Sequence, residues 1–223
     1  MLKPITSNIL QRTFQIRYGQ KIATCFTTDV DGLRYLISAR HVVERIKGTA
    51  SVEIKHDGKW KPLDVALVGH GEGDVDVSVL APKQSFGPGH SLTFSNTGDY
   101  ILSKAVYFFG FPFGLSTPVG KNNQDFPVPF VKKAIIASWN KSRIYLDGHN
   151  NSVFSGGPVV LERDVTKVIG IVSSYLSETC SVVDRKGNEV RLDLNTGIVE
   201  VIISKAIKDL IESNPIGLPI SDS

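Results

Sequence analysis

Residues 147–160 read Asp-Gly-His-Asn-Asn-Ser-Val-Phe-Ser-Gly-Gly-Pro-Val-Val, and this is the most specific pattern in the chain. Two glycines and a proline directly follow Ser155, and an apolar run follows them. Glycine lets the backbone turn tightly around a serine hydroxyl and leaves nearby amides free to face a substrate oxygen. The tetrapeptide Ser-Gly-Gly-Pro also fits an ordinary turn, so its meaning depends on the rest of the chain.

A histidine and an aspartate lie upstream in settings that suit them to act with Ser155. His41 falls at the end of an apolar run, where a strand gives way to a turn, and Asp76 leads into the apolar run Val77–Leu80. Taken alone, such a histidine is more often a packing residue, and a loop aspartate is more often solvated. In chain order, however, His41, Asp76 and Ser155 are the residue types of a general base, its orienting acid and a serine nucleophile.

Asp74 competes with Asp76 for the role of orienting acid. Burying a carboxylate costs several kcal/mol unless it is hydrogen-bonded or paired, so the acid should have a partner at the start of a buried strand. Asp76 heads the strand-like run, whereas Asp74 lies further back in a glycine-rich loop. We therefore predict that Asp76 is the acid.

Most of the chain has the pattern of β-strands. Turn signals such as Asp31-Gly32 separate short apolar or alternating runs at intervals of roughly 10 residues, which is typical of antiparallel barrels and sandwiches. The predicted strands cover residues 13–18, 22–28, 34–38, 51–54, 63–68, 75–80, 105–109, 133–138, 143–146, 158–161, 168–173, 181–183, 189–192 and 198–202. One helix is predicted over Lys205–Glu212, behind Ser204 as its N-cap. The proline-rich stretch 110–130 is predicted to connect two β halves.

The composition excludes several classes of protein. With 223 residues, 41% of them hydrophobic, the chain fits one globular domain rather than a disordered, collagen-like or coiled-coil protein. Its 25 Lys+Arg against 22 Asp+Glu are spread along the sequence, so nucleic acid is not an expected partner. The only two cysteines, Cys25 and Cys180, are expected to be core thiols, and the histidine spacing indicates no metal or other cofactor.

The location of the protein is also constrained. Residues 1–20 contain no apolar stretch of the kind that a secretory signal needs. The longest apolar run, residues 105–115, is interrupted by glycine and proline and is too short to span a bilayer. We therefore expect a soluble, cytoplasmic protein without a membrane partner. The sequence does not indicate its oligomeric state.

Six segments in order resemble chymotrypsin-fold serine proteases, and most closely the bacterial trypsin-like peptidases of the HtrA and glutamyl-endopeptidase kind. The likeness covers nearly the whole chain and is carried by residues 22–28, 38–43, 76–80, 110–114, 170–175 and 196–204, together with the Ser-Gly-Gly-Pro motif. It implies an all-β fold of two packed antiparallel six-stranded barrels with a C-terminal α-helix. The expected divisions are about 1–105 and 106–203 for the barrels and 204–213 for the helix, without a PDZ domain.

The resemblance implies a serine endopeptidase that cleaves protein or peptide substrates through an acyl-enzyme. Ser155 would attack the carbonyl, with His41 as base and Asp76 as the orienting acid. The backbone amides of Val153 and Ser155 would form the oxyanion hole. The substrate-binding residues implied are His149, in the position of the pocket floor, and Ser173, Ser174 and Tyr175 in the strand that pairs with the bound peptide.

Two departures from the family pattern bear on the mechanism. Val153 and Phe154 stand where the family has a glycine followed by Asn or Asp, and a β-branched valine resists a positive φ, so the oxyanion hole is expected to be collapsed without substrate. His149 at the pocket floor offers no carboxylate to a basic side chain. We therefore expect an apolar or acidic residue, not Lys or Arg, on the acyl side of the cleaved bond.

A non-enzymatic alternative remains open from the sequence. The same fold can serve as a catalytically weak or inactive module that binds peptides or a protein partner. The presence of all three triad residue types favours the enzyme, because a module that only binds has no physical need for them.

Overall fold

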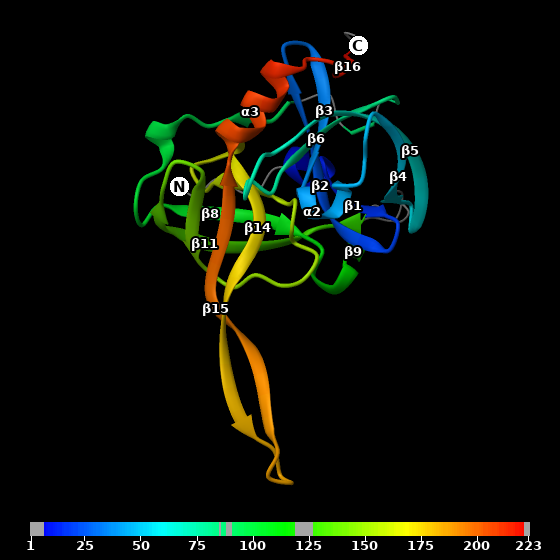
Figure 1. The fold of residues 1–223 in the computed structure, drawn as a ribbon. Helices are drawn as coiled ribbons and strands as arrows, with labels where there is room; N and C mark the ends of the chain where they lie inside the picture. The colour runs from blue at the N-terminus through cyan, green and yellow to red at the C-terminus, as the bar shows by residue number, and fades with distance from the viewer. Residues whose placement is uncertain (1–6, 85, 88–90, 119–126, 221–223) are drawn as a thin grey trace.

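The computed structural model describes residues 7–84, 86–87, 91–118 and 127–220, and most of them lie in β-strands, as predicted. The first barrel is built from β1 (Thr13–Tyr18), β2 (Lys21–Val30), β3 (Leu33–Ser38), β4 (Thr49–His56), β5 (Lys59–His70) and β6 (Ser78–Pro82). These strands pair antiparallel in the order β3-β2-β1-β4-β5-β6, and a pairing between β3 and β6 closes the barrel (Figure 1).

The second barrel is formed by the later strands. They are β8 (Ala105–Gly110), β11 (Phe130–Trp139), β12 (Arg143–Asp147), β13 (Pro158–Leu161), β14 (Asp164–Val183) and β15 (Glu189–Ile203). Their order is β13-β8-β11-β12-β15-β14, and β13 pairs with β14 to close it. A short strand, β7 (Thr93–Phe94), adds to β14 in parallel. The predicted fold of two six-stranded barrels is confirmed.

Short elements complete the fold. The predicted C-terminal helix is α3 (Ser204–Ser213), but the predicted N-cap is wrong: Ser204 is the first helical residue and Ile203 is the N-cap, without a side-chain cap. After α3, β16 (Leu218–Pro219) pairs with β3. The remaining short elements are α1 (Ser7–Gln11), α2 (Arg40–Val43), the 3₁₀ turns η1 (Thr97–Asp99) and η2 (Pro112–Gly114), and the strand pair β9 (Thr117–Pro118) and β10 (Pro127–Val128). No helix in the described part of the chain is long and apolar enough to cross a membrane.

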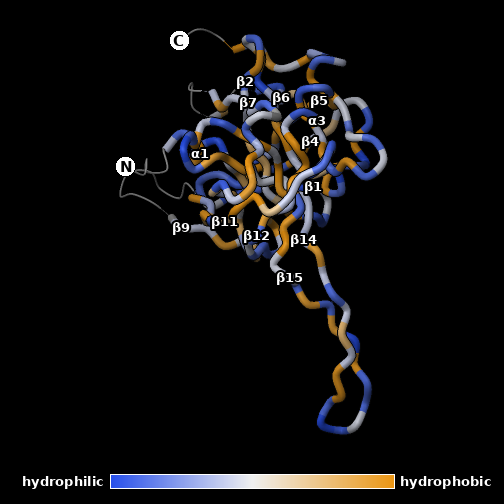
Figure 2. The backbone as a smooth tube through the Cα atoms, turned by 90° about the vertical axis from the view of Figure 1, so that its left-hand side faces the viewer, coloured by the Kyte–Doolittle hydropathy of each residue, from blue (hydrophilic) through white to orange (hydrophobic). Residues whose placement is uncertain are grey.

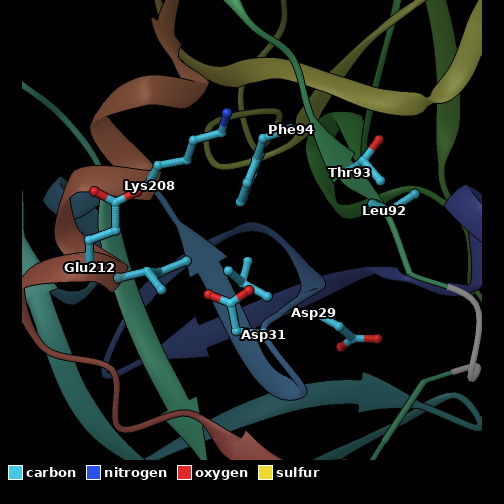
Figure 3. Close-up of a pocket in the computed structure, with 9 residues that line it drawn as sticks. Asp29, Asp31, Leu92, Thr93, Phe94, Lys208 and Glu212 are labelled. Carbon is cyan, nitrogen blue, oxygen red and sulfur yellow. The ribbon is translucent and has the colours of Figure 1, made fainter.

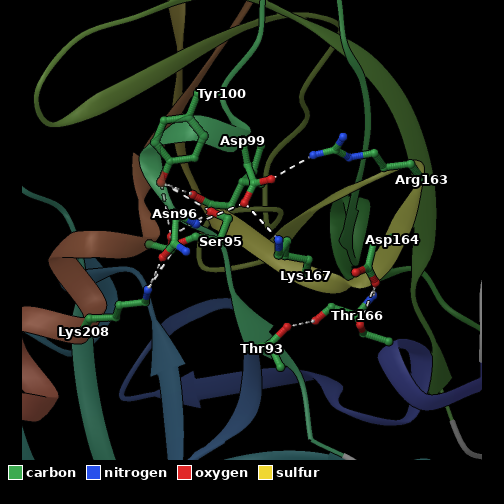
Figure 4. Close-up of polar contacts among 12 residues, drawn as sticks. Thr93, Ser95, Asn96, Asp99, Tyr100, Arg163, Asp164, Thr166, Lys167 and Lys208 are labelled. Carbon is green, nitrogen blue, oxygen red and sulfur yellow. Dashed lines mark hydrogen bonds and ion pairs between the residues drawn. The ribbon is translucent and has the colours of Figure 1, made fainter.

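The segment between the barrels is anchored by charged and polar contacts. Asp99 in η1 forms ion pairs with Arg163 at 2.8 Å and Lys167 at 3.1 Å, both of which flank or belong to β14 (Figure 4). Lys208 of α3 donates to the backbone oxygen of Ser95 at 3.2 Å. This segment and the C-terminal helix are therefore fastened to the second barrel.

Some predictions about the elements are wrong. Residues 110–130 do not connect the two barrels, because β8 and β11 on either side of them both belong to the second barrel; residues 119–126 lie outside the described part. The predicted strands 168–173 and 181–183 are one strand, β14, and 189–192 and 198–202 are likewise one strand, β15. β6 begins at Ser78 rather than at residue 75.

The two cysteines are free, but only one of them is a core thiol. Cys25 is fully buried inside the first barrel, where burial raises the pKa of its thiol well above the usual range. Cys180 lies on the outer part of β14 and is partly exposed. The expectation of two core thiols is therefore wrong for Cys180, because β14 continues beyond the barrel.

A buried ion cluster lies at the base of the first barrel. Asp29 accepts from Arg12 at 2.7 Å and from Arg34 at 2.7 Å, and all three side chains are at least 90% buried. Burial raises the pKa of Asp29, but hydrogen bonds from Arg34 and Arg12 outweigh it, so the pKa lies below its usual range. A carboxylate with a depressed pKa stabilises the fold above its unfolded-state pKa and loses that contribution as the pH falls through its folded pKa.

We expect Asp29→Asn to lower the free energy of unfolding by about 3 kcal/mol at neutral pH, because it leaves two buried guanidinium groups short of their counter-charge. The matched control is Asp57→Asn, whose carboxylate pairs with Lys61 at the surface and should contribute little. Urea denaturation at pH 7 and at about pH 2.5 measures both. The difference between parent and Asp29→Asn should shrink only below about pH 4, as the pH falls through the lowered folded-state pKa of Asp29, and equal stability of the two at pH 7 would contradict the assignment.

Candidate active site

His41 and Asp76 form a directly bonded pair in the first barrel. His41 lies in the short helix α2, just after β3, and the prediction of a turn there missed this helix. Oδ1 of Asp76 accepts the His41 backbone amide at 2.9 Å, and Oδ2 lies 2.8 Å from Nδ1 of the imidazole. Two contacts from one residue fix the carboxylate, and an ionised Asp76 selects the tautomer with a proton on Nδ1. That tautomer leaves Nε2 free to accept a proton.

The environment of Asp76 keeps it ionised. Burial raises the pKa of Asp76, but hydrogen bonds from His41 and Ser173 and the charge interaction with His41 outweigh it, so the pKa lies below the usual range. Asp74 has a different environment: its side chain is 71% exposed and pairs with Arg143 at 3.1 Å. Of the two candidate acids, only Asp76 contacts His41 in the described structure.

Ser155 joins this pair through a residue of the second barrel. Ser173, in β14, donates its hydroxyl to Asp76 at 2.9 Å, and its backbone oxygen accepts the hydroxyl of Ser155 at 2.8 Å. The hydrogen bonds of the described residues include none between Ser155 and His41. The structure thus brings the three predicted residues into one cluster, with the serine hydroxyl turned towards Ser173.

The Ser-Gly-Gly-Pro motif places Ser155 against the first barrel. Gly156 has φ +86°, and a Cβ there would lie 2.1 Å from the backbone oxygen of Thr24. A Cβ on Gly157 would lie 1.9 Å from the backbone oxygen of Phe109. The Thr24 amide in turn donates to the Ser155 carbonyl at 3.0 Å. Glycine at both positions allows the serine backbone to pack directly against β2.

The amides predicted to form an oxyanion hole are those of Val153 and Ser155. Among the described residues, the amides of Val153 and Ser155 donate to no protein atom. The Ser152 carbonyl accepts the Phe113 amide at 3.3 Å, and the Val153 carbonyl accepts the Thr24 hydroxyl at 2.5 Å. These two bonds fix the carbonyls on either side of Val153 and so constrain the direction of its amide.

Val153 adopts a positive φ of 75°, although its β-branched side chain disfavours that region. The surrounding loop therefore imposes a conformation that valine alone would avoid. Strain of this kind is worth about 1–3 kcal/mol and is often stored at functional sites. The premise of the predicted collapse, that valine avoids a positive φ, is therefore wrong at Val153, because tertiary contacts impose that conformation.

Replacing Val153 with glycine should raise the free energy of unfolding by about 1 kcal/mol, because relief of strain exceeds the entropy that glycine adds to the unfolded chain. Chemical denaturation of parent and variant measures the change. Val165→Gly is the control, since this buried β14 valine has no positive φ and should lose about 2–3 kcal/mol. A Val153→Gly protein less stable than the parent by a similar amount would show that the positive φ carries no strain.

Phe154 packs the loop of residues 148–154 against the second barrel. Its side chain is fully buried, meets Phe108 edge to face at 5.4 Å, and lies over Gly110, where a Cβ would approach the ring to 2.5 Å. Lys132 lies 5.3 Å from the ring centroid and donates to the His149 carbonyl at 2.7 Å. The chain thus holds this loop by aromatic packing of Phe154 and by the hydrogen bond from Lys132.

Sequence reasoning missed Lys132. Its Nζ also donates to the Asn151 side chain, and burial lowers the pKa of its ammonium. The available signal was its place in a basic doublet flanked by apolar residues, which does not by itself indicate a loop contact. The contact of Lys132 with this loop follows only from the fold, in which β11 lies beside residues 149–154.

The other predicted substrate-binding residues lie on the same side of the second barrel. His149 is exposed, in the loop that follows β12. Ser174 and Tyr175 follow Ser173 in β14; the Ser174 hydroxyl bonds Glu200, and Tyr175 is 39% exposed. A hollow of about 200 Å³ lies beside His41, with Arg40, Glu44 and residues 73–76 in its lining.

A second hollow, of about 440 Å³, lies elsewhere, between the β2–β3 turn and α3 (Figure 3). Its described lining consists of acidic and apolar side chains together with Thr93 and Lys208, and no serine, cysteine or histidine is among these described residues. Its Asp29 belongs to the buried ion cluster. Within the described residues, no group of three or more His, Cys, Asp or Glu side chains could hold a metal ion.

Two closed six-stranded barrels that contribute a histidine, an aspartate and a serine to one cluster define the chymotrypsin-like class of proteins. Residues 23–171 match the family model of the trypsin-like peptidase domain, which is more than half of the chain. The chain therefore belongs to the trypsin-like peptidase family.

Solved structures agree at the level of the fold. The HtrA-type protease AlgW with a tripeptide superposes with a TM-score of 0.62 at 20% sequence identity, and a variant of AlgW, also with a tripeptide, does so with 0.62 at 19%. Each alignment covers 93% of this chain and 61% of the other, so the chain spans less than two thirds of the length of these proteases. No curated protein sequence matches this chain.

Proposed function

We propose that this protein is a serine endopeptidase with His41, Asp76 and Ser155 as its catalytic triad. In the reaction, the Ser155 hydroxyl turns from Ser173 to Nε2 of His41, gives up its proton there, and attacks the scissile carbonyl. His41 then passes that proton to the leaving amine, and water hydrolyses the acyl-enzyme by the same route. The observation that supports the proposal is the pair of hydrogen bonds between Asp76 and His41. They hold the imidazole in the tautomer with a proton on Nδ1, which leaves Nε2 free to act as the base.

The amides of Val153 and Ser155 would stabilise the oxyanion. Both lack protein acceptors in the described structure, and the carbonyls around Val153 are held by Phe113 and Thr24. Each donor in such a site is worth about 3 kcal/mol of transition-state stabilisation. We infer that a substrate carbonyl seated beside Ser155 would receive both hydrogen bonds.

The substrate backbone would pair with Ser173–Tyr175, and the side chain on the acyl side of the bond would lie near His149. The His149 carbonyl accepts a hydrogen bond from the Lys132 ammonium. Among the described residues, no carboxylate contacts His149. A bound lysine or arginine side chain would therefore be buried without a counter-charge, at a cost of several kcal/mol. Apolar or acidic side chains avoid this cost.

A peptide library incubated with the protein and read by mass spectrometry tests both the activity and the specificity. We expect cleavage after apolar or acidic residues, with Lys and Arg under-represented by at least about tenfold. Predominant cleavage after Lys or Arg would contradict the pocket assignment while leaving the triad intact. The absence of any Ser155-dependent cleavage would contradict the enzymatic function.

The turned serine supports one other candidate function. Because Ser155 bonds Ser173 rather than His41, the same site also fits a module that binds peptides without cleaving them. Such a module would retain library peptides on the folded protein and release them unchanged, which the same mass spectra distinguish.

A further inference from the structure

β14 and β15 extend far beyond the second barrel as a two-stranded ribbon. The ribbon comprises residues 177–195, paired from Ser177 with Asn195 to Val183 with Glu189, and it projects away from the body of the molecule (Figure 1). Residues 181–194 are all exposed. A two-stranded hairpin without further packing is at best marginally stable in water. A ribbon whose residues 181–194 are all exposed is therefore expected to gain stability from a binding partner.

The two faces of the ribbon differ in character. Residues paired across two strands point to the same face. Figure 2 shows hydrophobic and hydrophilic residues interspersed along the ribbon. One face carries the pairs Glu178–Leu194, Cys180–Leu192 and Val182–Val190, and its leucine and valine side chains are 38–51% exposed. The other face carries Ser177–Asn195, Thr179–Asp193, Ser181–Arg191 and Val183–Glu189, which are polar apart from Val183. An exposed apolar row on an unsupported ribbon indicates a surface to which another chain adds.

One edge of the ribbon is continuous with the candidate active site. One edge of β14 pairs with β15. The other edge pairs with β13 as far as Ile171, and there Val172 exchanges backbone hydrogen bonds with Gly156 and Gly157. From Ser173 to Val183, no strand of the described structure pairs with that edge. Ser173 is the residue that bonds both Asp76 and Ser155. The free edge therefore begins at the catalytic cluster and runs out along the ribbon.

We propose that this free edge binds an extended segment of the substrate polypeptide on the N-terminal side of the cleaved bond. The inference rests on the proposed function. A peptide that pairs antiparallel with Ser173–Tyr175 has its N-terminal side directed towards Val183, so the same chain would continue along the ribbon as a third strand. At about 3.3 Å per residue, the edge accommodates roughly ten substrate residues. Alternate apolar substrate side chains would lie beside Cys180 and Val182 and so extend the apolar face of β14.

The exposed apolar residues support a substrate chain as the occupant. Tyr175, Leu176 and Ile198, at the root of the ribbon, are 37–39% exposed. Exposed apolar side chains therefore occur near the active site as well as on the apolar face of the ribbon. A substrate with a long extended segment and apolar residues at alternate positions matches this arrangement.

Two fluorogenic peptides with the same residues around the cleaved bond test the proposal. One has roughly three residues before that bond, and the other has roughly ten with Leu or Val at alternate positions. We expect the long peptide to have a kcat/KM about 10- to 100-fold higher, since each added backbone hydrogen bond and apolar contact contributes modestly. In a variant in which an Asn-Gly turn joins Glu178 to Leu194, this advantage should vanish while the short peptide is cleaved as by the parent.

Point variants and a binding measurement sharpen the test. Val182→Asn, on the apolar face of β14, should reduce the advantage of the long peptide, and Arg191→Gln, on the polar face, should preserve it. In Ser155→Ala protein, the long peptide should bind at least about tenfold more tightly than the short one, and the shortened ribbon should remove the difference. This readout does not depend on cleavage, so failure of the proposed function is separable from failure of the inference.

Two outcomes would overturn the proposal. One is a shortened ribbon that retains the full preference for the long peptide in both cleavage and binding. The other is a parent that sediments as a dimer and a shortened variant that sediments as a monomer, with peptide length immaterial to both. The latter would assign the apolar face to a second copy of the chain.

Discussion

Replacing Ser155 with alanine is expected to lower kcat by about four to six orders of magnitude while the protein stays folded. The change removes one hydroxyl and its bond to the Ser173 carbonyl, and it opens no large cavity in the core. Hydrolysis of a fluorogenic peptide measures the loss, and thermal denaturation measures the fold.

The control for Ser155→Ala is Ser152→Ala in the same loop. The Ser152 side chain is exposed, and only its backbone oxygen takes part in a described contact, with Phe113. We expect this variant to keep activity within about threefold of the parent, since exposed substitutions away from special contacts change little. If Ser155→Ala cleaves peptides as fast as Ser152→Ala, Ser155 is not the nucleophile.

Asp76→Asn is expected to lower kcat by about 10⁴-fold. An asparagine offers one acceptor oxygen, whereas Asp76 accepts from the His41 backbone, from Nδ1 of the imidazole and from Ser173. The amide NH₂ would favour the imidazole tautomer that carries its proton on Nε2, and that tautomer cannot accept the proton of the serine. Steady-state kinetics should show the loss in kcat rather than in KM.

Asp74→Asn is the matched control for Asp76→Asn. Asp74 is exposed, pairs with Arg143 and does not contact His41, so its amide variant should retain nearly full activity. If Asp74→Asn is inactive and Asp76→Asn is active, the two aspartates have exchanged roles.

The sequence predicted a mainly β chain because the signals of strands are local, and the resemblance added the two barrels. Alternation in residues 13–18 and the apolar run 105–109 are each sufficient to predict a strand, and β1 and β8 match those ranges to within one residue. The chemistry of Ser155 was similarly local, since two glycines are needed where Thr24 and Phe109 approach its backbone. Patterns of this kind depend on backbone geometry within a few residues.

The features that sequence reasoning missed depend on distant contacts. The length of β14 could not be predicted, because residues 174–180 mix polar and apolar side chains without a buried face. The role of Lys132 requires β11 to lie beside residues 149–154. The positive φ of Val153 depends on Phe113 and Thr24. In each case tertiary packing outweighs the local preference.

The central claim is that Ser155 is a nucleophile activated by His41, and labelling with a fluorophosphonate tests it most directly. This reagent reacts with an activated serine and leaves ordinary serine hydroxyls unmodified. We predict one adduct per chain, mapped by mass spectrometry to Ser155 and lost after unfolding or in a His41→Ala variant. Folded, intact protein that takes up no label, or takes it up equally well without His41, would contradict the account.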